Sequence, residues 1–339
     1  WHLGCILLKM PAISLLTGAI VICKTNIPQG LLDGDSYNHL WGATVNPYDL
    51  ARAPGGSSGG EAASVAAQCS ALGFGTDIGG SVRGPAAACG LYGYKCTERR
   101  LSTQGVSMQE GPGQEAILSM LGPIATSVED CVLVMQTWLC DEMFSADPTF
   151  TAPLPWDDAA FRSDRPLRVA VMERHAGLVS ATSVRAVREA AAALQAGGAE
   201  IVKWDFGAKD QLFKDMVTCW TAALLCADQV QWLTDALDGE EPLPPGVIGV
   251  KEATAALKDN PAAVAHGLDP HSPAFVFQCQ AWQRSLRDEL TSRFDSLGID
   301  LLLTPASQTA AGKSKRNDAG VFTQWVNVVG WPAGTVPVT

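Results

Sequence analysis

The segment "PGGSSGGEAASVAAQCSALGFGTDIGGSVRGPAA", from Pro54 to Ala87, combines two glycine-rich turns with reactive hydroxyl groups. Ser57 and Ser58 lie among four glycines, and Ser81 follows a second glycine pair 24 residues after Ser57. No histidine lies within the segment. A serine hydroxyl is a poor nucleophile unless a base lies within hydrogen-bond reach. If a serine of this segment is a nucleophile, its proton must therefore go to some other group.

Two common meanings of glycine and serine clusters do not fit this segment. Residues Gly55–Gly59 satisfy the G-x-S-x-G pattern of a nucleophile elbow, but that motif requires a strand directly before the serine. The preceding "YDLARAP" is a proline-containing loop instead. A phosphate loop is disfavoured because the patterns G-x-x-x-x-G-K-[ST] and G-x-G-x-x-G after a strand are both missing. A turn without chemistry is disfavoured by the second GGS and its nearby arginine.

Composition limits the classes of partner. The chain has 339 residues, of which 47% are hydrophobic and 17% charged, and its formal net charge is −11. This charge disfavours nucleic acid and anionic membranes, because both bind basic surfaces. The five histidines show no metal-ligand spacing, so we expect no metal and no cofactor. The ten cysteines include no C-x-x-C pair, which predicts free thiols in a reducing compartment and a cytoplasmic location.

The start of the chain is apolar. The run from Met10 to Cys23 is flanked by lysines and, at fourteen residues, is too short for a helix that crosses a bilayer. It predicts a helix end followed by a buried parallel strand over Gly18–Cys23. The Asn-, Pro- and Gly-rich residues that follow predict a long structured loop. Within it, Asp33 and Asp35 are expected to be turn residues, because the other calcium-ligand positions are missing.

Periodic apolar patterns predict the helices and strands of the remaining chain. A strand, an amphipathic helix and a second strand follow one another between residues 167 and 204, which predicts a parallel β–α–β unit. Together the patterns favour one α/β domain with a buried mixed sheet. Helices are expected over Glu61–Leu72 and Ser127–Leu139. Strands are expected over Leu167–Met172 and Ala199–Trp204, and between them a helix that carries Val184 and Val187 and stops at Gly197. Residues 208–265 are expected to be mostly helical, followed by a long helix from Ser272 to Gly298 and a buried strand over Ile299–Pro305.

The chain resembles the amidase signature family. The resemblance lies in "GGSSGGEAASVAA" and "GFGTDIGGSVRGPAAACGLYGYKCT", with "KTNIPQG" and "NPYD" before them. Weaker likeness continues through "LLLTPA" and "WVNVVGWPAGTVPV", and the pattern is most similar to the acetamidase-type branch. Cys96 departs from it, because the family usually has proline after the lysine of "GYKCT"; this should affect a turn and not the chemistry.

The resemblance implies a fold and a domain layout. The fold implied is α/β, with a mixed central β-sheet covered by helices on both faces. Residues 1–339 would form one incomplete amidase domain, with a signature core at 50–130 and a more variable helical and β–α–β part at 140–300. The family members usually extend further at both ends, so we expect this chain to be truncated at both.

The resemblance also implies a Ser–Ser–Lys mechanism. Ser81 would be the nucleophile that forms an acyl-enzyme, and Ser57 would relay its proton after a cis peptide bond from Gly56. The backbone N–H groups of Ile78, Gly79, Gly80 and Ser81 itself would bind the oxyanion. Ser58 and Arg83 would support the two serines from beside them. Arg83 is equally compatible with a structural salt bridge. Leu31 would lie in the wall of the acyl pocket.

The catalytic lysine of the family does not map onto this chain. Lys24 belongs to "KTN" and Lys95 to "GYKCT", and Lys9 falls in the helix between the family's lysine and that strand. The base is therefore expected upstream of Trp1, and residues 1–339 alone are expected to hydrolyse amides poorly.

Three functions stay open from the sequence. The first is hydrolysis of a small-molecule carboxylic acid amide to a carboxylate and ammonia or an amine. The second is a truncated, inactive relative that retains an acyl-amide pocket. The third is an amidotransferase-subunit-like member. The sequence leaves homodimer formation open.

Overall fold

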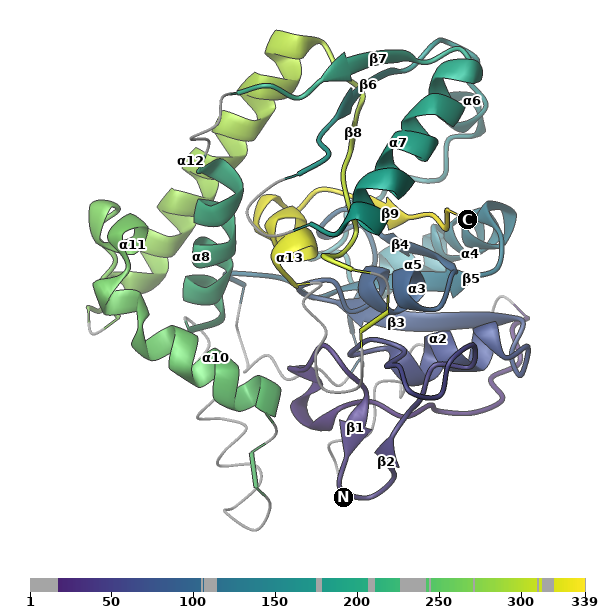
Figure 1. The fold of residues 1–339 in the computed structure, drawn as a ribbon, viewed down its shortest axis with the longest axis horizontal. Helices are drawn as coiled ribbons and strands as arrows, with labels where there is room; N and C mark the ends of the chain where they lie inside the picture. The colour runs from purple at the N-terminus through teal and green to yellow at the C-terminus, as the bar shows by residue number, and fades with distance from the viewer. Residues whose placement is uncertain are drawn as a thin grey trace.

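The computed structural model describes residues 18–338, except 105, 107–114, 175–178, 207–210, 226–241, 244, 271, 310 and 313–319. The described residues form an α/β structure in which helices cover two separate sheets (Figure 1). The predicted α/β class is confirmed. The predicted single mixed sheet is not seen among the described strands, because all pairings in one of the two larger sheets are antiparallel and all pairings in the other are parallel.

The antiparallel sheet carries the segment with the serines. Its strand order is β3 (Leu72–Asp77), β5 (Met120–Ala125), β4 (Tyr92–Lys95) and β9 (Ala333–Thr335). Helices α2 (Gly59–Ala66) and α3 (Arg83–Ala88) pack on one face, where they bury Ile124. Helix α4 (Val128–Trp138) packs on the other, where Phe74 lies 4.9 Å from the ring of Trp138. This sheet therefore has helices on both faces, as the resemblance implied.

Glycines on the α2 and α3 face let these helices approach the sheet closely. A Cβ atom added at Gly93 would lie 2.6 Å from the Cβ of Ala86 in α3, and one at Gly73 would lie 2.6 Å from Glu61 in α2. Gly75 faces the side chain of Ser58 in the same way. Because these strands lack side chains there, the helix starts that carry the signature residues lie directly against the sheet.

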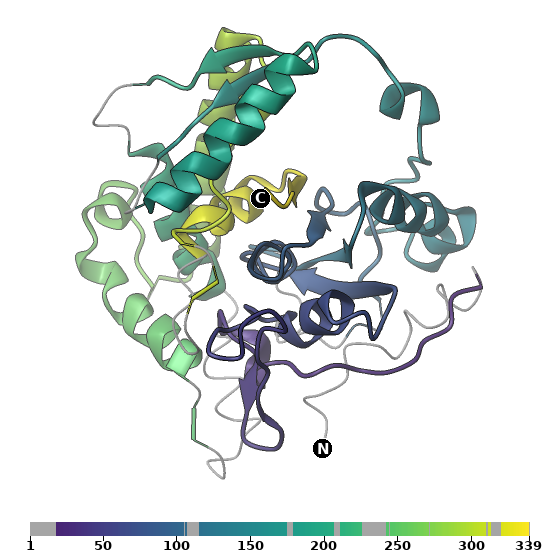
Figure 2. The ribbon, with the colours of Figure 1, turned by 45° about the vertical axis from the view of Figure 1, so that its right-hand side comes forward.

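The parallel sheet has the order β7 (Glu200–Lys203), β6 (Arg168–Val171) and β8 (Leu301–Leu303). Helix α7 (Ala181–Ala196) connects β6 to β7 and ends at Gly197, so the predicted β–α–β unit is confirmed. Helix α12 (Phe275–Leu297) ends at Gly298, a left-handed cap with φ of 58°, as predicted. Figure 2 shows α7 in front of this sheet and α12 behind it.

Helices α8 (Leu212–Leu225) and α13 (Gly320–Val329) connect the part of the molecule with the antiparallel sheet to the part with the parallel sheet. They pack against each other and against α12, and all three contribute to one apolar core. The N-cap Ser127 of α4 accepts a hydrogen bond from the Asp130 N–H, as its pattern predicted. The remaining elements are η1 (Gln29–Leu31), β1 (Tyr37–Asn38), β2 (Gly42–Ala43), α5 (Asp141–Ala146), α6 (Asp158–Phe161), α10 (Pro245–Ala255), η2 (Leu257–Asp259) and α11 (Pro261–Ala265).

Four predicted elements differ from the structure. Residues 18–23 form no strand, and Ile20 is 85% exposed, because no described strand pairs with them. The helix expected over Glu61–Leu72 ends at Ala66, since the chain enters strand β3 at Leu72. Helix α12 begins three residues later than Ser272, after the N-cap Ala274. Strand β8 is a short edge strand and is not fully buried.

Among the described residues, eight cysteines are free thiols. None of the helices that the structure describes is long and apolar enough to cross a membrane. Within the same ranges, no group of three or more His, Cys, Asp or Glu side chains could hold a metal ion. Three of the five histidines, His2, His175 and His271, lie outside the described residues.

Replacing Gly93 by alanine should destabilise the protein. The new Cβ atom would overlap Ala86 and push α3 away from the sheet, which should lower the free energy of unfolding by about 1–3 kcal/mol. The matched control is Gly249→Ala in α10, where a Cβ atom has open space and should stabilise the helix by up to about 1 kcal/mol. Urea unfolding measures both changes. Equal stability of the two variants would contradict the close approach of α3.

Candidate active site

The structure brings the two serine segments together. The backbone N–H of Ser58 donates to the carbonyl oxygen of Ser81 over 3.2 Å. Ser57 and Ser58 are buried, and Ser81 is partly buried. The Gly56–Ser57 peptide bond is cis, as the resemblance implied. Residues that are far apart along the chain therefore share one site at the end of β3.

Ser36, which the sequence did not single out, holds the turn that contains Ser57. Its hydroxyl lies 3.1 Å from the carbonyl oxygens of Gly55 and Ser57, which it can donate to in turn. The same oxygen accepts a hydrogen bond from the Gly59 N–H at 2.9 Å. One buried side chain thus connects both ends of the turn.

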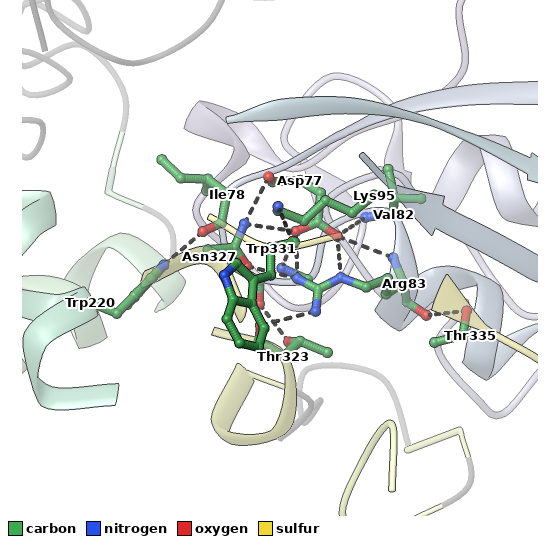
Figure 3. A network of polar contacts seen from close by, with 12 residues as sticks. Asp77, Ile78, Val82, Arg83, Lys95, Trp220, Thr323, Asn327, Trp331 and Thr335 are labelled. Atoms are coloured by element: carbon green, nitrogen blue, oxygen red, sulfur yellow. Dashed lines mark hydrogen bonds and ion pairs between the residues drawn. The ribbon is translucent and has the colours of Figure 1, made fainter. Parts of the chain in front are cut away.

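Asp77 shapes the second turn, which carries Ser81 (Figure 3). Its carboxylate accepts hydrogen bonds from the N–H groups of Gly80 at 2.8 Å and Val82 at 3.2 Å. The guanidinium of Arg83 donates to both carboxylate oxygens, at 2.9 and 2.8 Å. Asp77 is 0% exposed. A strand followed by Asp and two glycines is a recognisable turn signal, so this residue could have been found from the sequence.

The Asp77 carboxyl is ionised despite its burial. Burial raises its pKa, but the charges of Arg83 and Lys95 and the hydrogen bonds from Arg83 and Asn327 outweigh this and hold the pKa at about 2. The predicted salt bridge of Arg83 is therefore present, between two buried side chains. Arg83 acts on the turn through Asp77.

Lys95 has a structural role, as its position in "GYKCT" implied. Its ammonium group donates to the carbonyl oxygens of Cys96 and Trp331, both at 3.0 Å. Burial and the nearby Arg83 lower the pKa of Lys95. Cys96, the position that departs from the family pattern, is buried with its thiol 3.4 Å from the carbonyl oxygen of Leu121.

Helix α13, near the carboxyl end of the chain, contributes two further side chains to this hydrogen-bond network. Asn327 donates to the backbone oxygen of Asp77 at 3.0 Å and to its carboxylate at 3.1 Å, and it accepts from Arg83 at 2.7 Å. The hydroxyl of Thr323 donates to the carbonyl oxygen of Gly79 at 2.5 Å. Neither residue has a local sequence pattern that indicates this role.

The four predicted oxyanion donors differ in the hydrogen bonds that their N–H groups make. The N–H of Gly80 donates to the carboxylate of Asp77 at 2.8 Å. Within the described residues, the N–H groups of Ile78, Gly79 and Ser81 have no acceptor. Their role in binding an oxyanion remains a prediction.

One predicted site position, Leu31, is not connected to the serines by described contacts. Leu31 lies at the end of η1 with a φ of 59°, which is unusual for a residue with a side chain. Its N–H donates to the carbonyl oxygen of Pro28, and its place in an acyl pocket remains a prediction. Lys9 lies outside the described residues.

The chain belongs to the amidase family, whose model matches residues 15–339. It is 32% identical to fatty-acid amide hydrolase 1 of Sus scrofa over 341 residues, which cover 96% of this chain and 58% of that protein. It is 44% identical to an acetamidase of Aspergillus oryzae over 142 residues, which cover 42% of this chain and 26% of that protein.

A solved structure of fatty acid amide hydrolase is similar over 96% of this chain and 55% of that one, with a TM-score of 0.83 and 28% identity. The chain thus spans a little more than half the length of the fatty-acid amide hydrolases that it matches. The predicted family is confirmed. These similarities do not separate one branch of it from another.

Replacing Asp77 by asparagine should strongly destabilise the protein. The change leaves the buried charge of Arg83 without its carboxylate partner, which should lower the free energy of unfolding by about 3–5 kcal/mol. The matched control is Asp300→Asn, because Asp300 also has a pKa of about 2 but pairs with the exposed Arg165. Urea unfolding should show a much smaller loss there. Equal losses would contradict the role of burial.

The same pair predicts a pH dependence. The folded-state pKa of Asp77 is about 2, below the ordinary value of 3.8, so its contribution to stability is complete above 3.8 and is lost as the pH falls towards 2. The free energy of unfolding should therefore fall more steeply with decreasing pH in the wild type than in Asp77→Asn. Denaturant titrations at several pH values between about 5 and 2 measure the two slopes. Identical slopes would contradict the lowered pKa.

Proposed function

We propose that the protein containing this chain hydrolyses carboxylic acid amides to a carboxylate and ammonia or an amine, through an acyl-enzyme on Ser81. The observation that carries the proposal is the turn held by the buried Asp77 carboxylate. It holds Ser81 beside N–H groups with no described acceptor, and the Ser58 N–H links it to the Ser57 segment. The 32% identity to a fatty-acid amide hydrolase supports the same chemistry.

The proposed reaction begins when the Ser81 oxygen attacks the amide carbonyl carbon. A C–O bond forms, the carbonyl π electrons move to oxygen, and the Ser81 proton passes to Ser57, whose own proton goes to a base. The N–H groups of Ile78, Gly79 and Ser81 stabilise the developing oxyanion, a contribution that is typically worth about 10²–10³ in rate for each donor. Collapse of this intermediate breaks the C–N bond, and the relay returns a proton to the leaving nitrogen. Water then hydrolyses the acyl ester and frees Ser81.

The base in this proposal is a neutral lysine of another segment, as the family pattern implies. A lysine serves as a base only when its surroundings lower its pKa towards neutrality. Lys95 is buried with a lowered pKa, but its ammonium group is directed to the carbonyl oxygens of Cys96 and Trp331. We therefore assign Lys95 to the structure and not to the proton relay.

The finer assignments are proposals of the same kind. We retain the acetamidase-type branch because of the 44% identity to an acetamidase, with a small-molecule amide as substrate. We retain a cytoplasmic location because the described cysteines are free thiols. Homodimer formation and the layout of one domain with a core at 50–130 and a variable part at 140–300 also remain predictions.

A fluorophosphonate should label Ser81 in the protein of natural length. Peptide mass analysis should find the adduct on Ser81, and Ser81→Ala should remove it without loss of the folded state. Ser57→Ala should slow the labelling by about 10²–10⁴, because the proton relay is lost. The matched control is Ser296→Ala on the exposed end of α12, which should react at the wild-type rate.

Hydrolysis of acetamide, benzamide and a long-chain primary amide tests the substrate class in parallel. Ammonia release that disappears in Ser81→Ala supports an amide hydrolase. An adduct on Ser57, or neither adduct nor turnover in the folded protein, would contradict the proposal. The second of these results would favour an inactive relative that only binds amides.

A further inference from the structure

The carbonyl oxygen of Ile78 accepts a hydrogen bond from a side chain on a distant helix. The indole N–H of Trp220, in α8, donates to it over 2.7 Å across a sequence separation of 142 residues (Figure 3). Trp220 is 7% exposed, so the bond is sealed from solvent. Because water cannot replace the indole at this buried position, loss of the hydrogen bond would leave the Ile78 oxygen without a partner.

This bond sets the direction of the next N–H group. A trans peptide is planar, and its C=O and N–H point in opposite directions. A donor that fixes the Ile78 oxygen therefore also fixes the N–H of Gly79, which belongs to the same peptide. That N–H has no acceptor within the described residues.

We propose that Trp220 is a positioning residue that aims the Gly79 N–H at the oxyanion formed on the substrate. This inference rests on the proposed acyl-enzyme chemistry of Ser81. Trp220 touches no reacting atom in this role and acts only through the Ile78–Gly79 peptide.

The neighbouring peptide shows why Trp220 matters for this donor. In the Gly79–Gly80 peptide, Thr323 holds the oxygen and Asp77 holds the N–H, so both ends are fixed and neither is left for a ligand. In the Ile78–Gly79 peptide only the oxygen is held, by Trp220. The Gly79 N–H is thus free to bind an oxyanion, and its direction is set by the hydrogen bond from Trp220 to the oxygen of the same peptide.

The indole also shapes the turn by contact. A Cβ atom added at Gly79 would lie 2.8 Å from Cζ2 of Trp220, so the ring lies directly against the backbone. Helix α8 is itself braced, because Phe213 packs edge-on against Trp325 of α13 at 5.1 Å. Trp220 therefore transmits the position of a rigid helix pair to the turn.

Another buried tryptophan provides a matched control. Trp282 of α12 belongs to the same apolar core and is similarly buried, but its indole N–H has no partner among the described residues. Trp282→Phe removes an N–H that makes no hydrogen bond within the described residues, whereas Trp220→Phe removes one that holds the Ile78 oxygen. Only Trp220→Phe removes contacts with the Ile78–Gly79 peptide, namely the hydrogen bond to the Ile78 oxygen and the ring contact with Gly79.

The test compares kinetics in the protein of natural length, on the amide that it hydrolyses fastest. Trp220→Phe should lower kcat by about 10- to 100-fold with KM within about twofold, the pattern of an interaction made in the transition state. Its affinity for a trifluoromethyl ketone, which forms a hemiketal oxyanion with the serine, should fall by the same factor. Trp282→Phe should leave both within about twofold of the wild type.

An unchanged kcat and inhibitor affinity in folded Trp220→Phe would overturn the proposal, as would a rise in KM alone. If Trp220→Phe does not fold, replacement of Trp220 by β-(3-benzothienyl)alanine decides the question, because that side chain keeps the ring shape and lacks the N–H. A wild type that is neither labelled nor active contradicts the proposed function itself, and the role of Trp220 falls with it.

Discussion

The buried ion pair between Asp77 and Arg83 is the interaction on which the site depends. A buried carboxylate is tolerated only when its charge is paired and its lone pairs are used. Here the partners come from the turn after β3, from α3 and from Asn327 on α13. The turn with Ser81 cannot relax without leaving one of these groups unpaired. A single carboxylate thus connects strand β3, the turn that carries Ser81 and helices α3 and α13.

The glycines also hold the site together, because they lack side chains at the positions where helices and strands come into close contact. Because Gly73 and Gly93 leave the sheet face bare, α2 and α3 lie directly on it, and their first residues reach the same end of β3. Gly56 has no room for a Cβ atom either, since one would lie 2.6 Å from the backbone of Asp33 and Asp35. The glycine-rich signature is therefore a requirement of packing as well as of chemistry.

Features with a local cause could be predicted from the sequence. The Ser127 cap and the Gly298 stop each depend on residues within a few positions of one another. The β6–α7–β7 unit follows from the periodic patterns of three consecutive segments. The two serines were identified from a family pattern. Ser36, Thr323, Asn327 and Trp220 were not predicted, because tertiary packing brings them to the signature turns across 19 to 250 residues.

The most direct measurement is a crystal structure of the natural-length protein with a trifluoromethyl ketone bound. We expect a covalent bond from the Ser81 oxygen and a hemiketal oxygen about 2.7–3.1 Å from the N–H groups of Gly79 and Ser81. The Gly80 N–H should still donate to Asp77, as it does without ligand. An adduct on another residue, or a Gly80 N–H that has left Asp77 for the oxyanion, would contradict the proposed arrangement.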